Sequence, residues 1–360
     1  MPPFLLTRMK KFLSLLLLFG ILSFSFAFSS CEEQPKKEKF SAYSFDYFDT
    51  VATIIGYEEN RQKFDEIANE IFALLGEYHR LYTIYHRYEG LENLCTINEL
   101  VNGEHRTVTV DRRIIDMLLY AKEMYTITNG KVNVAMGSVL SIWHDYRDMG
   151  TSDPQTAVLP PIEKLQEASY HTNIENLIIN EEACTVLLKD NKMRLDVGAI
   201  AKGYAVEMVA QWLEARGITG YVLNIGGNVR TIGTKADGTA WTVGIDNPDG
   251  TDDAPYYAYL ALADQSVVTS GSYQRYYVVN GKAYHHIIDP ATLMPAERYV
   301  SISIVSNNSA EGDALSTALF CMSPEEGLAL VNEYFPHVGV LWVMSDGTRQ
   351  ETSNFKNFEK

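Results

Sequence analysis

The sequence predicts an α+β fold, with a single domain of mixed, largely antiparallel sheets and packed helices. Three observations lead to this prediction. The first half contains two amphipathic helical segments, and the second half alternates apolar strands with tight turns at Gly226-Gly227, Asp237-Gly238 and Asn280-Gly281. Two further helical segments and a strand close the chain. Strands joined by tight turns pair antiparallel, so this order does not predict a doubly wound parallel sheet.

The first half of the domain is expected to supply one strand and two helices. The β-branched and aromatic run 43–56 predicts a strand. Apolar residues at helical spacing predict a helix over 61–82. A second helix is predicted over 111–128, where Asn129-Gly130 ends it.

The second half is expected to consist mainly of hairpins. TVLLKD and KMRLDV predict a hairpin around Asp190-Asn191, and a helix follows from near 198–201 to Gly217. The segment 266–290 is predicted to be strand, turn, strand, with a hairpin at Asn280-Gly281. The remaining predicted elements are strands at 221–225, 228–233, 241–246 and 338–347, and helices at 310–320 and 324–334.

The N-terminal residues 1–30 are predicted to be a secretory signal. Three bases and no acid precede an uncharged apolar run at 12–28, which lies at the lower edge of a membrane span. Cys31 follows two serines, as in the lipobox of bacterial lipoproteins, although Phe28 stands where that pattern prefers an aliphatic residue. The alternative is a signal peptide cut nearby that leaves Cys31 free. We expect lipidation at Cys31, a polar tether over 31–40, a domain over 41–360, and a lipid-anchored place on the extracytoplasmic side of a bacterial membrane.

The charge and the cysteines exclude several classes of function. The whole chain carries −16, and residues 31–360 carry −19, from 27 bases and 46 acids. A net negative charge of this size makes binding to nucleic acid, and broad adhesion to an anionic membrane, unfavourable. An anionic ligand therefore needs a locally positive site or a metal. Cys95, Cys184 and Cys321 are odd in number and lack metal-like spacing, so no disulfide framework is predicted.

The segment LDVGAIAKGYAVE, residues 195–207, crowds charged and small residues at a predicted strand-to-helix turn. A helix N-terminus offers free N–H groups and a partial charge of about +0.5, which attract phosphate. Lys202 would add a full charge, and Gly198 and Gly203 would leave room for close approach. The alternative is that these small residues only let the helix pack against the sheet. The segment is not a Walker A loop, and the chain has no GxGxxG.

Two other segments carry candidate chemistry. Asp313 and Thr317 stand four apart in SAEGDALSTALF, so they share a helix face and offer hard oxygen ligands suited to Mg²⁺. The alternative for this pair is a helix cap or a surface contact. In YHHIIDP, adjacent histidines on a strand face opposite sides. His285 is expected to be solvated, and His286 is either a base or a satisfied core histidine.

Six segments resemble, in the same order, the hallmark segments of the FAD:protein FMN transferases, the ApbE-like family. They are LDVGAIAKGYAVE, VLNIGGNVRTIG, WTVGIDNP, TSGSYQRYY, HHIIDPATLMP and DALSTALF, and the likeness runs from about residue 45 to 345. The resemblance implies a T-fold-related catalytic domain in an exported lipoprotein. It also implies that Mg²⁺ and FAD are used to attach FMN, through a phosphoester, to a threonine of another protein with release of AMP. The implied acceptor is a subunit of a membrane redox complex.

The resemblance also implies roles for individual residues. The metal ligands would be Asp313, Thr317 and the backbone carbonyl of Ala199, and His286 would act with Asp313 in catalysis as the base near the accepting hydroxyl. The implied contacts to FAD are Tyr85, Lys131, Val132, Asn133, Asp196, Lys202, Ser270, His286 and Ile287. The chain departs from the family at Asn133, where an aspartate is usual, and near Phe48, where a methionine is replaced.

Two alternative functions remain open at this point. One is a Mg²⁺-dependent FAD pyrophosphatase, in which water replaces the threonine and the products are free FMN and AMP. The other is a flavin-binding lipoprotein without turnover. Wide separation of Asp313, Thr317 and His286 in the fold would favour the second alternative.

Overall fold

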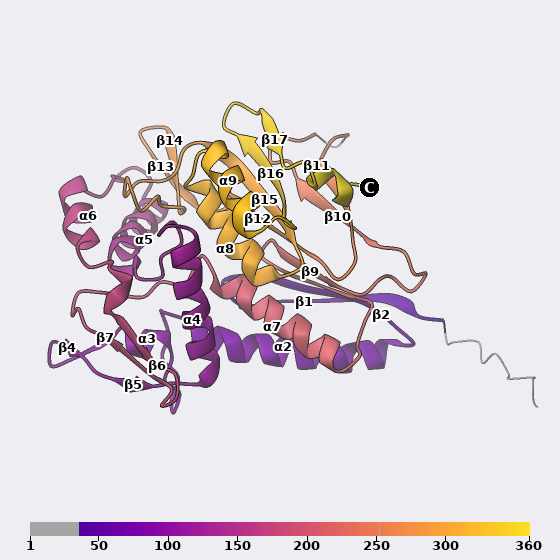
Figure 1. The fold of residues 1–360 in the computed structure, drawn as a ribbon, viewed down its shortest axis with the longest axis horizontal. Helices are drawn as coiled ribbons and strands as arrows, with labels where there is room; N and C mark the ends of the chain where they lie inside the picture. Colours follow the sequence, from indigo (N-terminus) through magenta and orange to yellow (C-terminus); the bar gives the residue numbers. More distant parts are fainter. Residues whose placement is uncertain (1–35, 252) are drawn as a thin grey trace, which may run out of the picture. The chain divides into compact units, whose positions relative to one another are not determined.

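The computed structural model describes residues 36–251 and 253–360 (Figure 1). The predicted signal peptide over 1–30 and the predicted lipidation site Cys31 lie outside the described residues. Glu38–Lys360 form one compact unit. Within the described part of the chain, none of the helices combines the length and the apolar character that a membrane span requires.

An eight-stranded sheet forms the centre of this unit, and all its neighbouring strands pair antiparallel. Its order places strands from the middle of the chain beside the N-terminal hairpin. The strands, in spatial order, are β1 (Glu38–Tyr47), β2 (Thr50–Glu58), β8 (Tyr221–Ile225), β9 (Asn228–Ile232), β12 (Ser266–Gly271), β15 (Tyr299–Ser306), β16 (Gly339–Met344) and β17 (Arg349–Glu351).

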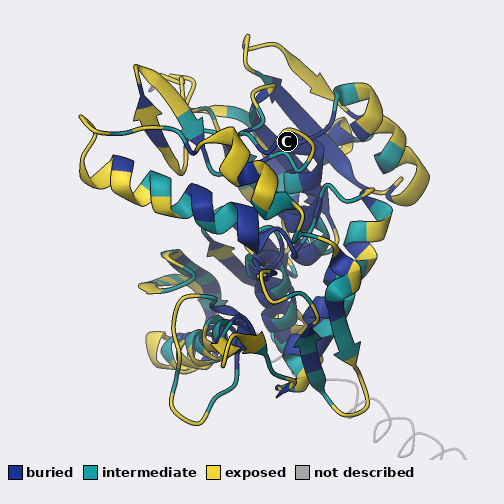
Figure 2. Ribbon diagram, turned by 90° about the vertical axis from the view of Figure 1, so that its left-hand side faces the viewer, coloured by how far each residue is buried: buried dark blue, intermediate teal, exposed yellow. Residues whose placement is uncertain are grey.

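Three helices pack against one face of this sheet: α2 (Arg61–Tyr82), α7 (Ala201–Ala215) and α8 (Ser309–Phe320). Because side chains alternate along a strand, Ile302 and Ile304 of β15 face the helices while Val305 belongs to a second core on the other face. Figure 2 shows that the buried residues gather in the strands and on the inner faces of the helices. Ten of the 12 residues of α8 are buried, so this helix runs through the core and is not amphipathic.

The other elements surround the central sheet. The remaining helices are α3 (Leu94–Ile97), α4 (Arg112–Ile127), α5 (Gly137–Ser152), α6 (Ile162–Ser169) and α9 (Pro324–Tyr334), with 3-10 turns η1 (Ile174–Asn176) and η2 (Phe355–Phe358). A three-stranded sheet joins β5 (Val108–Thr109), β7 (Thr185–Leu188) and β6 (Leu177–Asn180). Three two-stranded sheets join β3 (Leu100–Val101) to β4 (Glu104–His105), β10 (Trp241–Asp246) to β11 (Tyr256–Leu262), and β13 (Tyr276–Val279) to β14 (Lys282–His285).

The predicted α+β class is confirmed, and the helices predicted over 61–82 and 111–128 correspond to α2 and α4. The single strand predicted over 43–56 is wrong. It is a hairpin of β1 and β2 whose turn residues Phe48 and Asp49 have φ angles of 55° and 52°. Phe48 is a residue that rarely adopts a positive φ, so Asp49 was the one weak signal of this turn.

The hairpin predicted around Asp190-Asn191 is also wrong. The strand β7 pairs with β5 and β6, not with the segment that follows it. The backbone N–H of Leu195 donates instead to Asn98 Oδ1 at 2.7 Å, and that of Asp196 donates to the Val134 carbonyl at 2.8 Å. These distant partners satisfy the segment without a neighbouring strand, which local sequence could not reveal.

Candidate active site

A cavity of about 500 Å³ brings together nearly all of the predicted site residues. This volume lies in the range of small-molecule sites. The predicted residues in its wall are Tyr85, Lys131, Asn133, Asp196, Ala199, Lys202, Ser270, His286, Ile287, Asp313 and Thr317. Val132 differs from them, because its side chain is 1% exposed and packs in the main core.

The helix α8 contributes Asp313 and Thr317 to the cavity wall. Asp313 is 3% exposed, and its Oδ2 accepts a hydrogen bond from the backbone N–H of Gly203 at 2.8 Å. Its other oxygen, Oδ1, lies 3.7 Å from Lys202 Nζ. Burial raises the pKa of Asp313, and the Lys202 charge opposes that shift. The ionised carboxylate would therefore gain much from a bound cation.

Gly203 faces α8 and not the cavity. A Cβ atom at this position would lie 2.3 Å from the Ser309 carbonyl oxygen and 2.4 Å from Asp313 Cβ. The expectation that Gly203 leaves room for a phosphate is therefore wrong, and the packing alternative describes it. Its missing side chain lets α7 and α8 approach closely, which places Lys202 beside Asp313. Gly198 does lie in the cavity wall.

The turn that leads into α7 is more fully hydrogen-bonded than the sequence suggests. The N–H groups of Gly198, Ile200, Ala201 and Gly203 already donate to protein oxygens. The helix end consequently offers an anion fewer free N–H groups than expected. Lys202, whose side chain is 26% exposed, is left as the clearer anion-binding group of this turn.

The two adjacent histidines have opposite environments. His286 lines the cavity, and its Nδ1–H is placed to donate to the Arg275 carbonyl at 3.2 Å, which leaves Nε2 as the free acceptor. Burial, followed by the Lys202 and Arg275 charges, lowers the pKa of His286 to about 3. His285 is only 8% exposed, and its Nε2 lies 2.7 Å from the Ala296 carbonyl. The expectation that His285 is solvated is therefore wrong, and it is the satisfied core histidine of the pair.

The residues around Asp313 suit a hard divalent cation. Thr317 and Ala199 line the same cavity, and the buried Oδ1 of Asn228 in its wall has no hydrogen-bond partner. No group of three or more His, Cys, Asp or Glu side chains that could hold a metal occurs among residues 36–251 and 253–360. A cation here would thus be held by a carboxylate, a hydroxyl, a carbonyl and ligand or water oxygens. That donor set fits Mg²⁺ better than a softer transition metal.

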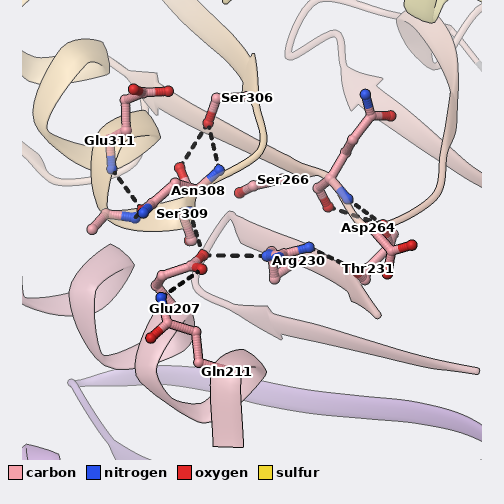
Figure 3. Close-up of polar contacts among 12 residues, drawn as sticks. Glu207, Gln211, Arg230, Thr231, Asp264, Ser266, Ser306, Asn308, Ser309 and Glu311 are labelled. Carbon is pink, nitrogen blue, oxygen red and sulfur yellow. Dashed lines mark hydrogen bonds and ion pairs between the residues drawn. The ribbon is translucent and has the colours of Figure 1, made fainter. Parts of the chain in front are cut away.

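A buried carboxylate of α7, Glu207, connects this helix both to β9 and to the start of α8 (Figure 3). Glu207 Oε2 accepts from Arg230 Nε at 3.2 Å and from the backbone N–H of Ser309 at 2.9 Å. Arg230 is 4% exposed and Glu207 is 3% exposed. Since Ser309 is the first residue of α8, this carboxylate fixes the start of the helix that carries Asp313.

The two departures from the family pattern have local explanations. Asn133 Nδ2 donates to the Thr172 carbonyl at 2.9 Å, and its Oδ1 accepts from the Ala135 N–H at 2.9 Å. An aspartate could not make the first of these bonds. Phe48 packs against the ring of His79, with 5.5 Å between ring centroids.

Several residues in the cavity wall were not predicted from the sequence. They are Asp49, Thr50, His144, Arg147, Asn228, Gln274 and Arg275. His144 and Arg147 stand three apart on α5, so their spacing could have identified a shared face had the helix been predicted. Asp49 and Thr50 reach the wall through the unpredicted β1–β2 turn.

Comparison with known proteins places these features in context. The profile of the ApbE family matches residues 48–342. An FAD:protein FMN transferase of Klebsiella pneumoniae (strain 342) is 32% identical over 270 residues, which cover 75% of this chain and 79% of that protein. One from Treponema pallidum (strain Nichols) is 34% identical over 253 residues, covering 66% and 67%.

Two solved structures have the same fold. The ApbE protein of Thermotoga maritima superposes with a TM-score of 0.77 at 27% identity, covering 90% of this chain and all of that one. The flavin transferase ApbE from Vibrio cholerae superposes with a TM-score of 0.72 at 25% identity, covering 89% and 99%.

Proposed function

Since this chain belongs to the ApbE family, we propose that it uses Mg²⁺ to move FMN from FAD onto a threonine hydroxyl of another protein, with release of AMP. Flavin transfer follows from the family; the metal, the threonine and the leaving group are the proposal. The observation that carries it is the convergence of Asp313, Thr317, Ala199, Lys202 and His286 on one cavity.

Asp313, Thr317 and the Ala199 carbonyl would hold the metal. A bound Mg²⁺ acts as a Lewis acid that neutralises phosphoryl oxygens and aligns the reacting groups. Lys202 is 3.7 Å from Asp313 Oδ1, so it is placed to contact the same diphosphate. Preorganised charges of this kind are worth about 10²–10³ in rate each.

The reaction exchanges one phosphorus–oxygen bond for another. The threonine Oγ forms a bond to the phosphorus on the FMN side of the diphosphate. The bond from that phosphorus to the bridging oxygen breaks, and AMP leaves with the electron pair. The threonine proton passes to Nε2 of His286, the nitrogen that the Arg275 carbonyl leaves free.

His286 is neutral before the reaction, which is the form that accepts a proton. Its pKa of about 3 reflects burial and the Lys202 and Arg275 charges, so the isolated imidazole is a weak base. An anionic diphosphate beside Lys202 would offset one of those charges and raise the basicity of His286. Substrate binding would in this way prepare the base.

The proposed acceptor is a subunit of an exported or membrane redox complex. The proposed location is the extracytoplasmic side of a bacterial membrane, with a lipid on Cys31, which lies outside the described residues. Mass spectrometry of the mature N-terminus tests the anchor: a lipid mass on Cys31 supports it, and an unmodified thiol excludes it.

The central experiment mixes the purified protein with FAD, Mg²⁺ and a flavin-carrying redox subunit, and measures covalent, fluorescent FMN on a threonine. Asp313→Ala should abolish metal-dependent transfer. Asp346→Ala is the matched control, because Asp346 lies in an exposed turn where its Oδ1 accepts from the Thr348 N–H at 2.9 Å. Equal losses from both variants would show that stability explains the effect. Release of free FMN and AMP without acceptor labelling would instead identify a pyrophosphatase.

A further inference from the structure

Three side chains connect the rim of the cavity to the turn before α7. The Tyr85 hydroxyl lies 3.3 Å from His144 Nδ1, and His144 Nε2 lies 3.7 Å from Asp196 Oδ2. All three side chains line the cavity. His144 has no role in the reaction described above.

His144 and Asp196 are held firmly by their surroundings. The neighbouring Trp143 is 4% exposed, and its Nε1 donates to the Leu293 carbonyl at 2.9 Å, which anchors α5 at this point. Asp196 is 9% exposed, and its Oδ1 accepts from the N–H of Gly198 at 2.9 Å. His144 and Asp196 therefore have fixed positions, and Tyr85 contacts His144 through its hydroxyl.

Tyr85 is different, because packing alone does not hold it. The residue is 56% exposed and follows the end of α2. Its hydroxyl contact to His144 is therefore the interaction that selects its orientation in the wall.

These contacts determine which ring nitrogen of His144 carries the proton. The Asp196 carboxylate near Nε2 favours the tautomer with its proton on Nε2. Nδ1 is then the acceptor for the Tyr85 hydroxyl. Burial lowers the pKa of His144, which agrees with a neutral ring.

We propose that His144 is a positioning residue that fixes Tyr85 against the bound flavin dinucleotide, with Asp196 setting the orientation of the imidazole. This inference rests on the proposed function. It assigns His144 to substrate binding and leaves the chemical step to the residues named above.

The test measures FAD affinity of the whole protein by flavin fluorescence in the absence of Mg²⁺, so that no turnover is needed. His144→Phe should weaken binding about fivefold, the effect of one neutral hydrogen bond. His144→Asn keeps a polar group near the Nδ1 position and should restore most of the affinity. His144→Gln keeps one near the Nε2 position and should restore less.

A double-mutant cycle and a matched control complete the test. Adding Tyr85→Phe to His144→Phe should cost no further affinity, because the two substitutions remove the same contact. His171→Phe is the control. His171 pairs with Asp190 at 2.7 Å, has the same 22% side-chain exposure as His144 and is absent from the cavity wall, so FAD affinity should not change.

The outcomes separate this inference from the proposed function. Two results would overturn the role of His144 while leaving the proposed function intact. In the first, the wild-type protein binds FAD normally and His144→Phe binds it equally well. In the second, the asparagine and glutamine variants have equal affinities for FAD. Additive losses from Tyr85→Phe and His144→Phe would also overturn it. Absence of FAD binding by the wild-type protein would overturn both. Should His144→Phe not fold, the asparagine and glutamine comparison still decides.

Discussion

Gly203→Ala tests whether the contact between α7 and α8 creates the active site. The added Cβ would lie 2.3 Å from the Ser309 carbonyl oxygen and 2.4 Å from Asp313 Cβ. Both atoms belong to the backbone or the stem of a buried helix, so neither can rotate away. The helix α8 must therefore shift by about 1 Å to restore an ordinary contact distance.

The expected costs to stability and to activity differ in size. Alanine favours the helix by about 1 kcal/mol over glycine, whereas overpacking of a core costs about 1–3 kcal/mol. The net loss in the free energy of unfolding should therefore be at most about 2 kcal/mol. A displacement of about 1 Å between catalytic groups lowers the rate by about 10²-fold. Activity should fall much further than stability.

The assay compares Mg²⁺-dependent AMP release with the thermal midpoint of the same variant. Gly327→Ala is the matched control, because Gly327 is also buried within a helix and its added Cβ would meet the side-chain atom Leu319 Cδ2 at 3.1 Å. That variant should keep full activity. If Gly203→Ala keeps activity within twofold of the wild type, the close approach of α7 and α8 is not what places the catalytic groups.

Asp313→Asn should lower Mg²⁺-dependent turnover by more than 10²-fold. The thermal midpoint in calorimetry should stay the same or rise, because the substitution removes a charge whose burial raises the pKa of Asp313. A lower midpoint would show that burial of this carboxylate does not destabilise the fold. His286→Ala should slow transfer by about 10²–10⁴-fold with little change in FAD affinity, and the reverse pattern would make His286 a binding residue. The folded protein keeps His286 neutral down to a pKa of about 3, whereas the unfolded chain takes up a proton below about 6.5, so His286→Gln should reduce the loss of stability between these pH values in denaturant titrations. Glu207→Gln should cost about 1.5–3 kcal/mol in the free energy of unfolding, because buried Arg230 loses one of its two carboxylate partners and keeps Glu214 at 3.0 Å, and adding Arg230→Met should restore part of it.

The parts of the site that the sequence predicted are those governed by local rules. Asp313 and Thr317 stand one helical turn apart, and α8 is a regular helix capped by the Asn308 side chain. The helix that carries Lys202 likewise follows from helical spacing and from Gly217 at its end, although the strand predicted before it does not form. Convergence on one cavity agrees with the resemblance to the family, whereas the spacing alone favoured a cap or a surface pair.

The parts that the sequence did not predict depend on tertiary contacts. The direction in which Gly203 points is set by the packing of α7 on α8, and no pattern within α7 records it. The helix α5 begins at Gly137, and Met136 at its N-cap position makes no side-chain capping bond, so the sequence contained no start signal for the helix that carries His144 and Arg147. The burial of His285 depends on the Ala296 carbonyl, which lies outside the local strand pattern.

The charge distribution of the cavity explains how an acidic protein can bind an anion. The wall holds four cationic and three acidic side chains among the described residues: Lys131, Arg147, Lys202, Arg275, Asp49, Asp196 and Asp313. Lys131 is already paired with Asp289 at 3.0 Å, so the wall offers little net positive charge of its own. Charges more than about 8–10 Å away are largely screened at physiological salt, so the −19 of residues 31–360 matters less than this wall. A divalent ion at Asp313 would turn a nearly balanced wall into a positive one, which is why metal and diphosphate should strengthen each other's binding.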